Sequence, residues 1–147
     1  MMTKIAILPL RKNSKGILGK NKRKMLGRPL FSWVLTEAAA SNLDAVYVFT
    51  DDTDILTYVE NEYVWNPKIK TLLRSDENAT DTASTESVMQ EFAKVLNHDF
   101  DILCLLQATS PMTTKVDINA VLDKIQKESF DSALTVVKTH RFSWNAN

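Results

Sequence analysis

Short apolar runs alternate with amphipathic segments along this chain, and that alternation limits its fold more than any other feature. The first run, from Ile5 to Leu8, is apolar without interruption, as expected for a strand covered on both faces of a parallel sheet. The predicted strands are residues 5–10, 45–50, 69–73, 102–106 and 132–138, and the predicted helices are residues 29–41, 52–63, 85–96 and 114–127. Five strands alternating with four helices predict an α/β fold, a Rossmann-like three-layer sandwich with a mostly parallel sheet.

Three of the predicted helices begin at residues that are suited to helix starts. Ser84 or Thr85 is placed to cap the third helix, and Thr114 with Asp117 has the spacing of a capping box. Residues 51–52 are both Asp and precede the second helix, where the helix dipole favours acids. Because adjacent residues at a strand end point in different directions, this pair is interpreted as a helix start rather than as metal ligands.

Length and composition predict one domain that spans residues 1–147. Of the 147 residues, 44% are hydrophobic, which is enough for one core. Cys104 lies in an apolar run and is predicted to be a buried thiol. Because it is the single cysteine, no disulfide can form within the chain. The sequence shows no signal-peptide segment and no apolar run of membrane length, so we expect a cytoplasmic protein without a membrane partner.

Charge is sorted along the chain although the formal net charge is zero. The first 36 residues hold nine Lys or Arg and no acid, so the remaining residues hold nine basic (18 − 9) and eighteen acidic side chains. Proteins that bind nucleic acids usually carry a net basic charge over a broad face. One cationic stretch in a neutral chain instead predicts a site for a localised anion and no nucleic-acid partner, with a solvated basic surface as the alternative.

The cationic stretch contains a loop, residues 11–21 (RKNSKGILGKN), directly after the first predicted strand. Two of the three glycines lie in this loop, which concentrates backbone freedom there. Its spacing matches neither a P-loop nor a dinucleotide-binding GxGxxG motif. It offers hydroxyl and backbone donors beside cationic side chains, which suits the oxygens of a triphosphate. The candidate phosphate ligands are Arg11, Ser14, Lys15, Gly16 and Lys20.

The carboxyl ends of the predicted strands are expected to meet at one crevice. Ligands of open α/β sheets bind beyond those ends. The loops expected there are residues 11–28, 51–52, 74–85 and 107–115. Side chains from four separate parts of the sequence are therefore predicted to surround one ligand.

Six short motifs occur within or beside these loops. They are LPLR (8–11), NSKG (13–16), KN (20–21), TDD (50–52), DTAST (81–85) and LQATSP (106–111). In order and spacing they resemble the N-terminal portion of the acylneuraminate cytidylyltransferase family, also called CMP-sialic acid synthetases, over nearly the whole chain. The segment HRFSW (140–144) also resembles a segment of many members. Each motif alone is short, but six in register make the resemblance specific.

The resemblance implies a nucleotide-diphospho-sugar transferase type of fold and a defined reaction. CMP would pass from CTP to the anomeric hydroxyl of a sialic-acid-like 2-keto acid sugar, with release of pyrophosphate and with Mg²⁺ as cofactor. The implied substrate-binding residues are Arg11, Ser14, Lys15, Gly16, Asn21, Arg74, Ala83, Thr85 and Gln107. Among them Gln107 would lie toward the sugar acid, and Arg11 with Lys20 would stabilise charge on the phosphates during catalysis.

Two cationic positions have competing interpretations. Arg74 is either a nucleotide contact, as the resemblance implies, or a surface partner of Asp76 or Glu77. The run of residues 22–24 (KRK) is predicted to be solvated surface rather than a ligand contact.

The sequence also departs from the family. Members are longer, and their segments with an acidic pair for magnesium, a later arginine, most sugar contacts and the interface of the homodimer have no counterpart here. A truncated family domain is therefore expected, in which Mg²⁺ is implied but its ligands are not identified. Two alternatives follow: a catalytically weak or silent nucleotide-binding module, or a cytidylyltransferase for another 2-keto acid sugar, such as an eight-carbon acid.

Overall fold

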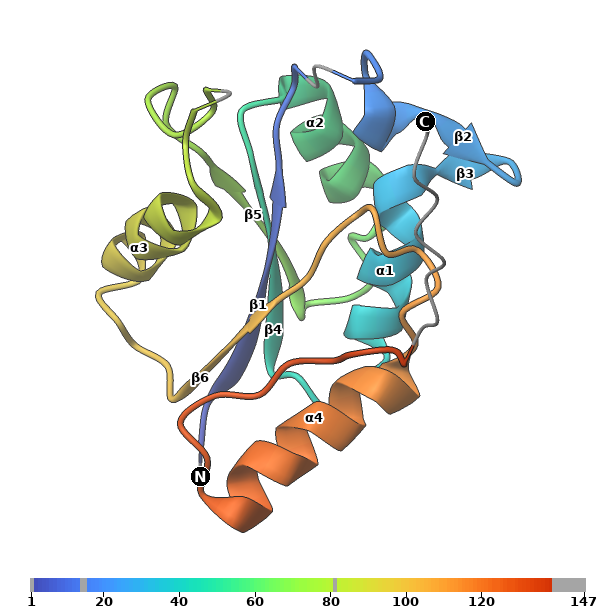
Figure 1. Ribbon diagram of the computed structural model, residues 1–147. Helices are drawn as coiled ribbons and strands as arrows, with labels where there is room; N and C mark the ends of the chain where they lie inside the picture. Colours follow the sequence, from blue (N-terminus) through green and yellow to red (C-terminus); the bar gives the residue numbers. More distant parts are fainter. Residues whose placement is uncertain (1, 14–15, 81, 139–147) are drawn as a thin grey trace, which may run out of the picture.

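The computed structural model describes residues 2–13, 16–80 and 82–138, which form the layered α/β architecture of Figure 1. A four-stranded sheet has the order β5-β4-β1-β6, and each pair of neighbouring strands is parallel. The strands are β1 (Lys4–Leu10), β4 (Ala45–Thr50), β5 (Ile69–Leu73) and β6 (Ile102–Leu105). The helices are α1 (Leu30–Ala39), α2 (Thr53–Glu62), α3 (Thr85–Val95) and α4 (Lys115–Glu128). The predicted α/β fold with a parallel sheet is confirmed.

Helices cover both faces of the sheet (Figure 1). Residues of α1, α2 and α4 form one hydrophobic core with Leu8 and Leu10 of β1, and residues of α3 form a second core with Ile5 and Ile7. Ile7 and Leu8 are both fully buried. The absence of polar alternation in the first apolar run is therefore explained by burial on both faces.

The prediction of a fifth strand at residues 132–138 is wrong. The segment forms no strand, and its apolar residues Leu134, Val136 and Val137 are 78%, 84% and 80% exposed. In the described part of the chain, β6 is an edge strand that pairs with β1 alone. An apolar pattern supplies strand propensity, but a strand forms only where a neighbouring strand completes its backbone hydrogen bonds.

A short antiparallel hairpin, β2 (Lys24–Met25) and β3 (Arg28–Pro29), precedes α1 and was not expected from the sequence. Leu26 and Gly27 form its turn, with φ angles of 50° and 87°. Positive φ at both central residues is typical of a type I′ turn, which suits a two-residue hairpin connection. Each strand is too short to show the alternating pattern by which strands are predicted.

Cys104 lies on β6, where it was predicted to be buried, and is partly buried against the hydrophobic core. Burial raises the pKa of its thiol to about 11. The thiol therefore stays protonated at neutral pH and packs as a small apolar side chain.

The helix starts agree with the expected caps. Asp52 is the N-cap of α2 and Ser84 is the N-cap of α3, and Thr114 with Asp117 forms the predicted capping box of α4. The backbone and side-chain hydrogen bonds from Thr114 lower the pKa of Asp117. Over the described residues, no helix combines the length and the apolar character needed to cross a membrane.

Ser84→Ala is expected to lower the free energy of unfolding by about 1 kcal/mol. The Ser84 hydroxyl accepts a hydrogen bond of 3.0 Å from the backbone N–H of Ser87. This N–H lies in the first turn of α3 and has no partner within the helix, so removing the hydroxyl leaves it without a hydrogen bond. Urea denaturation followed by circular dichroism measures the change. Ser84→Asp keeps an acceptor and should match the parent within about 0.5 kcal/mol; equal stability of parent and Ser84→Ala contradicts the capping role.

Candidate functional site

A pocket of about 350 Å³ opens at the carboxyl end of the sheet, among the loops that follow β1, β5 and β6. Its walls are formed by Pro9, Arg11, Lys20, Asn21, Arg74, Thr80, Ala83, Thr85, Val88, Leu105, Gln107, Ala108 and Thr109. Those that the resemblance implicates are Arg11, Lys20, Asn21, Arg74, Ala83, Thr85 and Gln107. The fold therefore brings these distant positions together, as the strand-end rule predicts. Their individual roles stay predictions.

The other predicted residues either lie outside the described part of the chain or do not line the pocket. Ser14 and Lys15, and the HRFSW segment at residues 140–144, lie outside the described residues. Gly16 is exposed and does not line the pocket, and a Cβ atom added to it would meet nothing within 4 Å. Residues 51–52, which were expected in the crevice, do not line it either.

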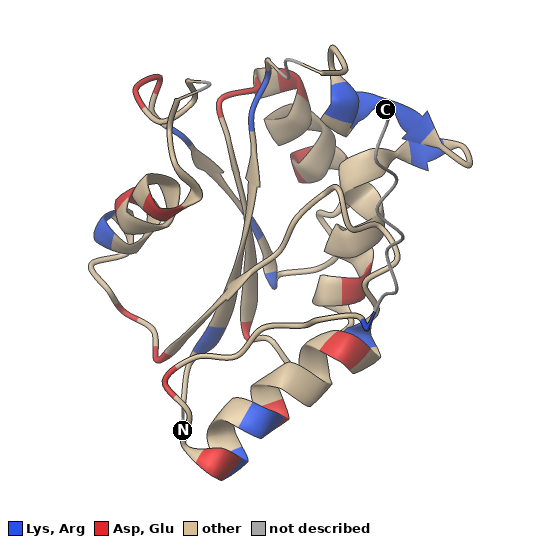
Figure 2. Ribbon diagram, viewed as in Figure 1, with Lys and Arg blue, Asp and Glu red and all other residues tan. Residues whose placement is uncertain are grey.

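The pocket is cationic. Its charged lining residues are Arg11, Lys20 and Arg74, and no carboxylate lines it in the part of the chain that the structure describes. Figure 2 shows further Lys and Arg gathered nearby, on η1 (Lys20–Lys22) and the β2–β3 hairpin. Three cations around one hollow favour an anion that carries several charges, such as a polyphosphate.

Arg74 is a buried cation in the wall of this pocket. It is 7% exposed, and one of its Nη atoms donates to the backbone carbonyl of Asn78. Its Nε has no hydrogen-bond partner among the described residues. Burial lowers the pKa of Arg74, an effect that nearby acids oppose. The alternative of a surface pair with Asp76 or Glu77 is therefore wrong, and the unsatisfied guanidinium favours an anionic ligand.

Glu91 of α3 holds the turn that follows Arg74. One carboxylate oxygen accepts from the backbone N–H of Ser75 at 2.9 Å, and the other accepts from the Asn78 side-chain amide at 2.7 Å. The same turn supplies the carbonyl that receives Arg74. The sequence did not predict these hydrogen bonds of Glu91, because Glu91 looks like any polar residue of an amphipathic helix.

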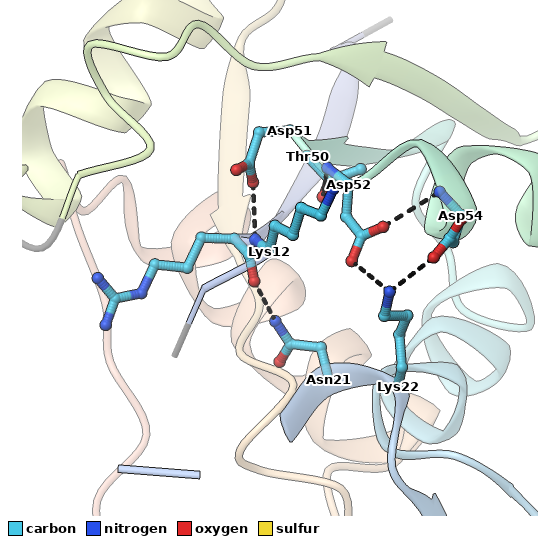
Figure 3. Close-up of polar contacts among 8 residues, drawn as sticks. Lys12, Asn21, Lys22, Thr50, Asp51, Asp52 and Asp54 are labelled. Carbon is cyan, nitrogen blue, oxygen red and sulfur yellow. Dashed lines mark hydrogen bonds and ion pairs between the residues drawn. The ribbon is translucent and has the colours of Figure 1, made fainter. Parts of the chain in front are cut away.

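The acids that follow β4 hold the cationic loop (Figure 3). Asp51 Oδ1 accepts from the backbone N–H of Lys12 at 2.8 Å. The Lys22 ammonium lies 2.9 Å from the Asp52 carboxylate and 2.8 Å from that of Asp54. The expected helix-start role of Asp52 is confirmed, since it accepts from the backbone N–H of Asp54. The side chain of Lys22 is 37% exposed, in keeping with the predicted surface position, but its ion pair with the buried Asp52 carboxylate was not predicted.

The described residues do not by themselves fit a magnesium ion. Mg²⁺ is held by oxygen ligands, usually one or two carboxylates together with substrate phosphates. Within the described ranges there is no group of three or more His, Cys, Asp or Glu placed to hold a metal, and the charged side chains of the pocket are cations. No step of the chemistry proposed below is assigned to a metal held by these residues.

Comparisons with known proteins give consistent matches. The family model described as cytidylyltransferase matches residues 5–147. N-acylneuraminate cytidylyltransferase B of Danio rerio is 37% identical over 139 residues, which cover 95% of this chain and 31% of that protein. Pseudaminic acid cytidylyltransferase of Campylobacter jejuni is 31% identical over 130 residues, which cover 87% of this chain and 56% of that protein.

A solved structure gives an independent match to the fold. The structure of CMP:2-keto-3-deoxy-manno-octonic acid synthetase complexed with CTP superposes with a TM-score of 0.67 at 23% identity, over 86% of this chain and 49% of that chain. The present chain thus spans between about a third and just over a half of the length of these proteins. The family match begins within β1 and includes every loop that lines the pocket. The family model covers nearly the whole chain, and the chain therefore belongs to the cytidylyltransferase family.

Proposed function

We propose that this chain is the CTP-binding domain of a cytidylyltransferase that transfers CMP to a sialic-acid-like 2-keto acid sugar and releases pyrophosphate. The observation that supports this most is the convergence of Arg11, Lys20 and Arg74 on one pocket at the carboxyl end of the sheet. Arg74 is more than fifty residues away in the sequence from the loop that holds Arg11 and Lys20, and the family model matches both segments.

In the proposed complex, the triphosphate of CTP lies against the end of β1. Arg11 and Lys20 stabilise the negative charge that develops on the phosphate oxygens, which is the main way that proteins accelerate such transfers. The remaining proposed contacts are Ser14, Lys15, Gly16, Asn21, Arg74, Ala83 and Thr85 to CTP, and Gln107 to the sugar acid. Arg74 is suited to this because the Nε donor of its planar guanidinium has no partner among the described residues.

The proposed reaction is a direct displacement at phosphorus. The anomeric oxygen of the sugar forms a bond to the α-phosphorus of CTP and gives up its proton to solvent water. The bond from the α-phosphorus to the oxygen bridging to the β-phosphate breaks, and pyrophosphate leaves with that electron pair. Cations that face the phosphates lower the barrier because the leaving oxygens gain charge in the transition state.

A pyrophosphate-release assay tests this function. The protein is incubated with CTP, Mg²⁺ and, in separate reactions, an N-acylneuraminate, pseudaminic acid or 2-keto-3-deoxy-manno-octonic acid, with UTP as the matched control nucleotide. We expect release with CTP, fastest with the N-acylneuraminate, and none with UTP. Release that proceeds equally with UTP contradicts a cytidylyltransferase.

A second candidate function is a nucleotide-binding module without turnover. It is favoured by the absence, among the described residues, of carboxylates grouped to hold a metal. Phosphoryl-type transfer depends on positioning and on electrostatic stabilisation, so a site that lacks part of this apparatus retains binding better than catalysis. Saturable CTP binding without pyrophosphate release from any of the three sugars identifies this second function.

A further inference from the structure

The cationic loop is tied at both of its ends to the turn that follows β4. At its start, the backbone N–H of Lys12 donates to Asp51 at 2.8 Å. At its end, the ammonium of Lys22 lies between the carboxylates of Asp52 and Asp54, as Figure 3 shows. These contacts fix the backbone at Lys12 and the side chain at Lys22 before a ligand binds, so less ordering of these two ends remains to be paid for on binding.

The tie at Lys22 is more than a surface ion pair. The Asp52 residue is 1% exposed, and its second oxygen accepts from the backbone N–H of Asp54 at 3.1 Å. Exposed ion pairs contribute little to stability, but a buried carboxylate that loses its cation is costly. Hydrogen bonds to Asp54 and Asp52 raise the pKa of Lys22, so the ammonium keeps its charge. The position of Lys22 is therefore dictated by Asp52.

Lys22 ends a single 3₁₀ turn whose preceding two residues line the pocket. Those residues are Lys20 and Asn21, and Asn21 is 8% exposed. The Asn21 side-chain amide donates to the backbone carbonyl of Arg11 at 3.2 Å. Because one turn of helix moves as a unit, holding Lys22 in place also holds Lys20 at the pocket and supports the backbone of Arg11.

We propose that Lys22 is a positioning residue for the triphosphate of CTP. It binds Asp52 and Asp54 instead of the ligand, and thereby keeps Lys20 and Asn21 turned toward the pocket. It also neutralises carboxylates whose charge would otherwise repel the phosphates. The inference rests on the proposed function, since CTP is the ligand for which the loop is positioned.

Calorimetric titration with CTP and with CMP tests the inference. Lys22→Met is expected to weaken CTP binding about tenfold and CMP binding by less than about threefold, because CMP lacks two of the phosphates that the loop would hold. Lys22→Arg keeps the cation and should bind CTP within about threefold of the parent. Lys24→Met is the matched control, since Lys24 is exposed and has no ion pair among the described residues.

Asp52→Asn separates positioning from direct contact with phosphate. It keeps a helix-capping side chain but removes the carboxylate that holds Lys22, so Asp52→Asn alone should weaken CTP binding, and the double variant with Lys22→Met should bind CTP no more weakly than Lys22→Met alone. A lysine that touched phosphate itself would not need Asp52, so Asp52→Asn alone would then leave CTP affinity unchanged or raise it. Asp54→Asn, at an exposed position, gives a second variant that should weaken CTP binding two- to threefold in the same direction.

The outcomes distinguish this inference from the function on which it rests. Equal CTP affinity of the parent and Lys22→Met, or an equal loss for CTP and CMP, overturns the positioning role while the CTP site stands. CTP affinity that Asp52→Asn alone leaves unchanged or raises also overturns it. Failure of the parent to bind CTP overturns the proposed function as well.

Discussion

Arg11→Ala is expected to lower kcat/KM for cytidylyl transfer by about 30- to 1000-fold, which corresponds to roughly 2–4 kcal/mol of transition-state stabilisation. Arg11 lies directly after β1, and its backbone carbonyl accepts a hydrogen bond from the Asn21 side chain. The backbone that carries the guanidinium is therefore fixed at the pocket. A charge that is already in place needs no reorganisation when the phosphates gain charge. The pyrophosphate-release assay measures the change.

Lys12→Ala provides the control for this experiment. Lys12 is the neighbouring cation, its side chain is exposed, and its tie to Asp51 uses the backbone N–H, which the substitution keeps. Its kcat/KM should therefore stay within about threefold of the parent, as expected for a surface substitution. Equal losses in the two variants would reduce the role of Arg11 to general surface charge, and equal turnover of Arg11→Ala and parent would refute it.

Arg74→Met is expected to weaken CTP binding about 10- to 100-fold, the range that charge-assisted hydrogen bonds provide. The same substitution should leave the free energy of unfolding unchanged or raise it, because it replaces a buried guanidinium whose Nε has no described partner by an apolar side chain of similar length. Loss of binding without loss of stability is typical of a residue kept for function. Calorimetry and urea denaturation measure the two quantities.

Arg74→Lys is the matched variant for Arg74→Met. It keeps a positive charge but loses the planar guanidinium, one Nη of which donates to the backbone carbonyl of Asn78. We therefore expect a CTP affinity between those of the parent and Arg74→Met. A Met variant that is less stable but binds CTP like the parent would assign Arg74 to the fold rather than to the ligand.

Much of the fold could be predicted from local patterns. The run from Ile5 to Leu8 predicts a doubly covered strand because burial on both faces leaves a local mark in the sequence. Thr114 and Asp117 predict a helix start for the same reason, since all partners of a capping box lie within one turn. Residues 132–138 were wrongly predicted as a strand, because strand formation depends on a neighbour that no local pattern reports.

The site was predictable only in part. Arg11, Lys20, Arg74 and Gln107 come together because the carboxyl ends of parallel strands share one edge of the sheet, which follows from the order of strands and helices. The ion pair of Lys22 with Asp52 was not predictable. It joins residues about thirty positions apart, and neither residue departs from an ordinary basic run or an ordinary helix start.

If the pocket binds the phosphates of a cytidine nucleotide, calorimetric titration of the parent protein with CMP, CDP and CTP in the presence of Mg²⁺ should detect it. We expect saturable binding at one site per chain, with an affinity that rises with each added phosphate and falls with added salt. No heat with CTP together with a clear signal for another nucleotide, or equal affinities for CMP and CTP, would contradict it.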